Sequence, residues 1–307
     1  MKRSLIARIA VVATAALALA ACGGVGSDPL QNGGSGGAAS GDTVVIGSAN
    51  FTESQIIANI YAQALQAKGV KVDLRPPIGS RETYYPAIQE GSIDLIPEYT
   101  GTLLQYIDKN ATETEPDAVY NALKGALPAN LTVLDKSAAE DKDAVVVTQE
   151  TATKYNAKSI EDLAANCGQL VFGGPPEFQT RPDGIPGIQK TYNCTFKEYK
   201  ALDAGGPLTV AALKNGDIQA ADIFTTDASI VTNNFVVLAD PKDNFAAQNV
   251  VPLITKSKAT GTTLDVLNQI SAKLTTDGLT KLNAEASSAA KPSLQTVATN
   301  RLSPTGF

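Results

Sequence analysis

The chain has 307 residues, with 25 basic and 31 acidic side chains and no histidine. Its acidic balance argues against a nucleic-acid partner and against a polybasic patch that binds membranes. Without histidine, catalytic triads of the usual kind and histidine-ligated zinc are excluded. An exported hydrolase with paired carboxylates is an alternative. Because nothing distinguishes Glu98 or Asp141 from ordinary carboxylates, we expect no catalytic residue, no metal and no cofactor.

The first 21 residues have the layout of a secretory signal peptide, with basic residues before an apolar run at residues 9–21. That run is too short to span a membrane comfortably. It ends in Leu19-Ala20-Ala21-Cys22, which resembles the bacterial lipobox. We therefore expect a lipid on the Cys22 thiol that anchors the exported protein to the outer face of the cell membrane. Residues 22–41 are rich in glycine and serine and predict a flexible tether; a signal peptide with a chance cysteine is the alternative.

The residues after the tether are enough for two lobes of ordinary size. Thr43–Ser48 predicts a strand, Thr52–Lys68 repeats apolar residues at helical spacing, and Val70–Leu74 predicts a second strand. This order favours a parallel sheet and an α/β fold. Residues 264–290 also have helical spacing, and we expect them to pack on the first lobe.

A near-repeat at a constant offset of 125 residues relates the two lobes. Residues 87–94 (AIQEGSID) are echoed by residues 212–219 (ALKNGDIQ), and an aromatic residue follows each copy. The pattern predicts a helix that ends at a glycine and then a short strand. Because ligand sites in open α/β sheets lie at the carboxyl ends of the strands, we expect Tyr99 and Phe224 on opposite walls of a cleft. Chance similarity is the alternative.

Two apolar segments, residues 144–148 and residues 250–254, are of the type that crosses between lobes, and we place two hinges there. Residues 42–145 with 250–307 would then form the first lobe, and residues 146–249 the second.

Cys167 and Cys194 are the cysteines that remain if Cys22 is lipidated. We expect them to form a disulfide, because an exported protein reaches a compartment that permits one. A metal site with two cysteines is a weaker alternative, since no histidine exists to complete it.

Three segments carry a resemblance to a known family: VVIGSANFTES at residues 44–54, GSRETYYPAIQEGSIDLIPEYTGTLL at residues 79–104, and FTTD at residues 224–227. From about residue 43 to about residue 300, the chain resembles the substrate-binding proteins of osmoprotectant (glycine betaine, choline, carnitine) ABC importers. The resemblance implies a two-lobed type II periplasmic-binding-protein fold with two hinge crossovers. It also implies a small-molecule ligand between the lobes and an ABC permease as partner.

The ligand cage that the resemblance implies is aromatic, because a quaternary ammonium is held by the negative faces of aromatic rings. Tyr99 matches a cage tyrosine and Thr102 matches a polar contact of the same motif. Arg181 matches an arginine that would face a ligand carboxylate.

Several positions depart from the pattern of the family. Asp143 and Gln248 stand where aromatic residues are expected, and Phe224 replaces a tyrosine. The cage is thereby expected to hold two rings, Tyr99 and Phe224. Tyr84 and Tyr85 are the nearest other rings, although packing roles explain them more simply.

Hydrogen-bonding side chains are expected beside the two rings, and they are Asn50, Thr102, Asp141, Asp143 and Gln248. Buried carboxylates need hydrogen-bond donors. This mixture suits a hydroxylated ligand, such as a polyol, a sugar-like or a phenolic compound, better than glycine betaine. We expect a monomer; a surface scavenger or receptor that feeds no permease is the other alternative.

Overall fold

The computed structural model describes residues 41–302. The predicted signal peptide, Cys22 and almost all of the predicted tether lie outside these residues. In the part of the chain that the structure describes, no helix is both long enough and apolar enough to cross a membrane.

The first of two five-stranded sheets has the strand order β2-β1-β3-β10-β4. Strand β1 (Thr43–Ile46) is parallel to β2 (Lys71–Leu74) and to β3 (Leu95–Tyr99), whereas β10 (Val250–Thr255) is antiparallel to β3 and to β4 (Leu131–Val133). The predicted β-α-β unit is therefore present, and its sheet carries one antiparallel strand contributed by a distant segment.

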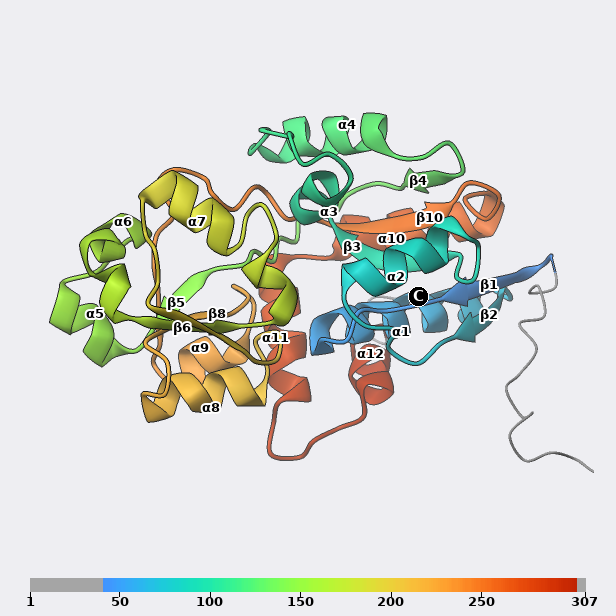
Figure 1. Ribbon diagram of the computed structural model, residues 1–307. Helices are drawn as coiled ribbons and strands as arrows, with labels where there is room; N and C mark the ends of the chain where they lie inside the picture. The colour runs from blue at the N-terminus through green and yellow to red at the C-terminus, as the bar shows by residue number, and fades with distance from the viewer. Residues whose placement is uncertain (1–40, 303–307) are drawn as a thin grey trace, which may run out of the picture. The chain divides into compact units, whose positions relative to one another are not determined.

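Helices cover both faces of the first sheet (Figure 1). Because successive strand side chains point to opposite faces, Val44 and Ile46 pack in one core cluster and Val45 in another. The C-terminal helices pack against α1 in the first cluster, as the sequence predicts for residues 264–290. The helices of this sheet are α1 (Thr52–Ala67), α2 (Arg81–Gln89), α3 (Thr100–Ile107), α4 (Pro116–Ala126), α10 (Gly261–Lys273), α11 (Thr276–Ala286) and α12 (Leu294–Leu302).

The second sheet repeats the plan of the first, in the order β7-β6-β8-β5-β9. Strand β6 (Val171–Gly174) is parallel to β7 (Glu198–Ala201) and β8 (Ala220–Asp222), and β5 (Val145–Val147) is antiparallel to β8 and β9 (Val236–Val237). Its α-helices are α5 (Gln149–Tyr155), α6 (Ile160–Leu163), α7 (Ile185–Tyr192), α8 (Pro207–Asn215) and α9 (Ala228–Thr232), and its 3-10 helices are Ala164–Gln169 and Pro176–Gln179.

The near-repeat of the sequence is also a structural repeat. Helices α2 and α8 both end before a glycine in the left-handed region, with φ of +79° at Gly91 and +80° at Gly216. In both copies a backbone N–H just beyond the glycine donates to a carbonyl inside the helix at 2.9 Å, from Ser92 to Ala87 and from Asp217 to Ala212. Glycine adopts this conformation with the least strain, which explains its presence in both copies.

The chain passes between the sheets just before β5 and just before β10. Both strands lie inside a sheet with partners on each side, so their apolar character reflects central burial. The connecting segments run antiparallel to each other, with the Asp141 N–H donating to the Gln248 carbonyl at 3.2 Å and a bridge between Glu140 and Asn249.

A disulfide joins Cys167 and Cys194, whose Cα atoms are 5.4 Å apart. Both cysteines are buried in the core of the second sheet. The bond links the 3-10 helix at Ala164–Gln169 to the segment that follows α7.

Candidate functional site

An inner cavity of about 40 Å³ lies among side chains from both halves of the fold. Seven of the eight predicted ligand-binding residues line it; the exception is Asn50, which is exposed and outside the lining. The nine lining residues are Phe51, Arg81, Tyr99, Thr102, Asp141, Asp143, Arg181, Phe224 and Gln248.

Three aromatic rings meet at this cavity. The Phe51 ring centroid lies 5.9 Å from that of Tyr99 and 5.0 Å from that of Phe224, with tilted planes in both pairs. Phe51 follows β1, Tyr99 ends β3, and Phe224 follows β8, so each ring stands at the carboxyl end of a strand. The expected count of two rings is wrong because Phe51 supplies a third.

The Tyr99 hydroxyl is fixed by a buried glutamate of α1. It donates to Glu53 Oε1 at 2.7 Å, while Glu53 Oε2 accepts from Thr226 Oγ1 at 2.6 Å and from Asn283 Nδ2 at 2.7 Å. Burial raises the pKa of the Glu53 carboxyl despite these hydrogen bonds. Glu53 therefore connects both halves of the fold beside the rings.

Arg81 is a lining residue that the sequence reasoning missed. Its Nε and Nη2 atoms contact the two carboxylate oxygens of Glu98 at 2.9 and 2.7 Å. Tyr84 donates its hydroxyl to the same carboxylate at 2.8 Å, so Tyr84 supports the ion pair and does not line the inner cavity.

Arg181 also pairs with a glutamate, and this contact joins the two halves of the fold. Its Nε and Nη2 atoms lie 3.1 and 3.2 Å from the carboxylate oxygens of Glu82 in the first turn of α2. Burial alone would raise the pKa of Glu82, but the hydrogen bonds and charge of Arg181 lower it to about 2.

Acidic side chains gather next to the rings. Asp141 Oδ1 accepts from the Thr226 N–H at 3.0 Å, and Asp143 lies against Asp222. Burial raises the pKa of Asp141, Asp143 and Asp222, and the charges of neighbouring carboxylates raise those of Asp141 and Asp222 further. Such carboxylates are costly unless they are protonated or meet a donor.

Gln248 holds the start of α3 in place. Its Oε1 atom accepts from the backbone N–H groups of Gly101 and Thr102, both at 3.1 Å, which satisfies two donors at the helix N-terminus. Its Nε2 atom is buried and has no hydrogen-bond partner among residues 41–302. The side chain thus keeps an unused donor beside the cavity.

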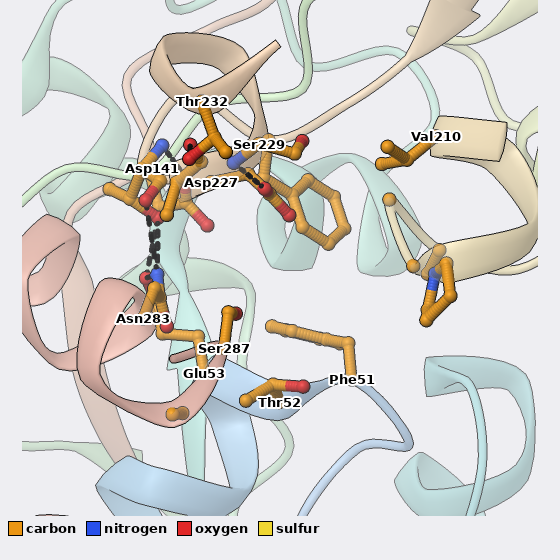
Figure 2. A pocket seen from close by; sticks show the side chains of 18 of the residues that line it. Phe51, Thr52, Glu53, Asp141, Val210, Asp227, Ser229, Thr232, Asn283 and Ser287 are labelled. Atoms are coloured by element: carbon orange, nitrogen blue, oxygen red, sulfur yellow. Dashed lines mark hydrogen bonds between the residues drawn. The ribbon is translucent and has the colours of Figure 1, made fainter. Parts of the chain in front are cut away.

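A larger cavity of about 550 Å³ adjoins the inner one (Figure 2). The two cavities share Phe51, Asp141 and Phe224 as lining residues. In Figure 2, Glu53 and Asn283 lie at one edge of this outer cavity and Val210 lies on the other side. Asn283 Nδ2 donates a hydrogen bond to Glu53 Oε2 at 2.7 Å. Among the residues described here, no group of His, Cys, Asp and Glu is arranged to hold a metal ion.

The comparisons with known proteins agree on one family. Residues 42–301 match the family described as the substrate-binding domain of the ABC-type glycine betaine transport system. A carnitine transport binding protein of Listeria monocytogenes is 29% identical over 295 residues, which cover 93% of this chain and 92% of the relative. A glycine-betaine-binding protein of Pseudomonas aeruginosa is 31% identical over 233 residues, covering 72% and 74%.

Solved structures confirm the predicted fold. A structure of a glycine betaine/carnitine/choline ABC transporter is 25% identical, with a TM-score of 0.69, and the match covers 86% of this chain and 98% of that one. Lactococcal OpuAC in its closed conformation with glycine betaine is 15% identical, with a TM-score of 0.61 over 86% and 96%. The architecture is the α/β, type II periplasmic-binding-protein fold that the sequence predicts.

Proposed function

This chain belongs to the family of substrate-binding domains of ABC-type glycine betaine transport systems, and we propose that it captures one small solute in the inner cavity and delivers it to the permease of an ABC importer. The convergence of Phe51, Tyr99 and Phe224 from both halves of the fold is the observation that carries this proposal. A solute between these rings would hold the two halves together, so binding would select one arrangement of the lobes.

The site must rearrange to admit a solute. A cavity of about 40 Å³ holds no more than a few water molecules. The Phe51–Phe224 ring contact bridges the two halves of the fold, so it is the contact that separates when the solute enters.

The solute that fits this lining best is small and hydroxylated. Asp141 and Asp143 favour a ligand that donates hydrogen bonds, because a donor offsets the cost of keeping these buried groups ionised. The three rings favour a methylated ammonium as the group that contacts the aromatic faces. A hydroxylated ammonium of the choline type meets both preferences. Polyols and phenolic compounds meet only the preference for a ligand that donates hydrogen bonds.

A calorimetric binding screen tests the proposal. The purified protein is titrated with choline, glycine betaine, carnitine, a polyol and a phenolic compound, and at least one is expected to bind. Tyr99→Ala is expected to abolish that binding, whereas Tyr155→Ala, which removes a ring from the second lobe outside the inner cavity, leaves it unchanged. Binding that survives Tyr99→Ala would place the solute elsewhere.

Export and anchoring complete the proposed function. The lipobox-like residues 19–22 support a protein that is held by a lipid on Cys22 at the outer face of the membrane. We propose that the anchored protein is a monomer and performs no catalysis, as its transport-binding relatives suggest. In this arrangement Cys22→Ser moves the protein from the membrane fraction to the soluble fraction of the producing cells.

A further inference from the structure

Some of the charged side chains that line the inner cavity form ion pairs and others do not. Its two cations, Arg81 and Arg181, each contact a glutamate. Asp141 and Asp143 form no ion pair within residues 41–302. Two guanidinium groups therefore face four carboxylates, and the site as a whole favours a cation over a ligand carboxylate.

Arg81 stays paired with Glu98. The side chains of Arg81 and Glu98 are 5% and 0% exposed, and Glu98 also accepts hydrogen bonds from Tyr84 and from the Tyr99 N–H. Separating such a pair would leave buried charges uncompensated, which is strongly unfavourable. A ligand carboxylate consequently has only Arg181 as an available cation.

Arg181 is held by Glu82 through two contacts across the two halves of the fold. Glu82 is 41% exposed, so water can solvate it when the contact opens. Glu82 stays ionised at neutral pH, because Arg181 lowers its pKa to about 2 against the opposing effect of burial. A ligand carboxylate must therefore displace an ionised glutamate from Arg181, whereas a hydroxyl group need not.

We propose that Glu82 is a specificity-determining residue that occupies Arg181 and so makes the site prefer a hydroxylated quaternary ammonium to the corresponding ammonium carboxylate. The inference rests on the proposed function, because it concerns the solute of the inner cavity. It assigns the choice between the two ligand classes to a glutamate that does not line that cavity.

Choline and glycine betaine are matched probes for this test, since both carry a trimethylammonium group and they differ in ending in a hydroxyl or a carboxylate. Calorimetric titration of the wild-type protein is expected to show tighter binding of choline. Glu82→Gln frees Arg181 and is expected to shift the ratio of the two dissociation constants about tenfold toward glycine betaine. Glu150→Gln makes the same change at an exposed site on α5 and is expected to leave the ratio unchanged.

The outcomes separate this inference from the proposed function. Binding of both probes with an unchanged ratio in Glu82→Gln, or a wild-type preference for glycine betaine, overturns the role of Glu82 alone. A folded wild-type protein that binds neither probe overturns the role of Glu82, and one that binds no compound of the screen overturns the proposed function as well. If Glu82→Gln does not fold, Glu82→Ala carries the test: it is expected to shift the ratio in the same direction, and an unchanged ratio would refute the assignment.

Discussion

At the scale of single residues, Phe51 occupies the central place in the proposed site. Its ring contacts both Tyr99 and Phe224, whereas the site places no other ring between those two. A cationic head group at a desolvated aromatic face is stabilised by about 2 kcal/mol. The removal of Phe51 therefore takes away one of three such faces and loosens the positions of the other two.

Phe51→Ala is expected to weaken solute binding by about tenfold or more. Calorimetric titration with the tightest solute of the screen measures the effect, and Phe196→Ala, which removes a partly buried ring beside Phe172, serves as the control. Equal affinities of the wild-type protein and Phe51→Ala would show that the third ring has no part in binding.

Asp183 gives the stability of the fold a pH dependence. Burial, followed by the charge of Asp143, raises its pKa to about 6, against the opposing charge of Arg181. The folded protein then binds the proton more tightly than the unfolded chain does, so the contribution of Asp183 to stability is full below pH 4 and is lost as pH rises through about 6.

Between pH 5 and pH 7.5, the free energy of unfolding of the wild-type protein is accordingly expected to fall by about 1 kcal/mol more than that of Asp183→Asn. Urea denaturation at both pH values measures this difference. Parallel pH profiles for the two proteins would contradict the raised pKa of Asp183.

The sequence predicted most of the residues that line the inner cavity but not the side chains and backbone groups that they contact. Tyr99, Thr102 and Arg181 stand in recognisable motifs, and the rule that placed Tyr99 and Phe224 at strand ends applies equally to Phe51, which follows the first strand. The contact from Gln248 to the start of α3 spans 147 residues to Gly101 and depends on how the crossing segments pair. No local pattern encodes such a contact.

At the scale of elements, the repeat predicts how much stability is lost when either of its two glycines is replaced. A Cβ atom at Gly91 or Gly216 would meet nothing within 4 Å, so the only cost of a side chain is the left-handed backbone. Each alanine variant is expected to lower the free energy of unfolding by about 1 kcal/mol. Gly125→Ala, in the last turn of α4 with equally open surroundings, is expected to raise it by up to about 1 kcal/mol.

Chemical denaturation of the three variants measures these energies. Similar losses at Gly91 and Gly216 with a gain at Gly125 would support the structural equivalence of the two units. A loss at only one of the two repeat glycines would contradict that equivalence.

The disulfide is the second feature whose effect on stability is predicted at the scale of elements. Cys167 and Cys194 are separated by 27 residues, and closing a loop of this length stabilises a folded domain by about 3 to 4 kcal/mol in the chain-entropy account. The double variant Cys167→Ser and Cys194→Ser is expected to lose about that much in urea denaturation. An unchanged midpoint in the double variant would mean that the bond adds nothing to stability.

At the scale of the whole molecule, the sequence predicted two units of one plan but misplaced the passages between them. The apolar segments at residues 144–148 and 250–254 are central strands, and the passages lie just before them. An apolar segment indicates burial, and a central strand is buried whether or not the chain crosses between the sheets there. Helix α12 was not predicted, because its apolar residues are few and its stability depends on packing against α1.

The central claim is that a small solute binds between Phe51, Tyr99 and Phe224, and a crystal structure of the protein with the tightest solute of the screen tests it most directly. The account predicts solute density among the three rings, with a donor group on Asp141 or Asp143. Density confined to the outer cavity, with the Phe51 and Phe224 rings still in contact, would contradict it.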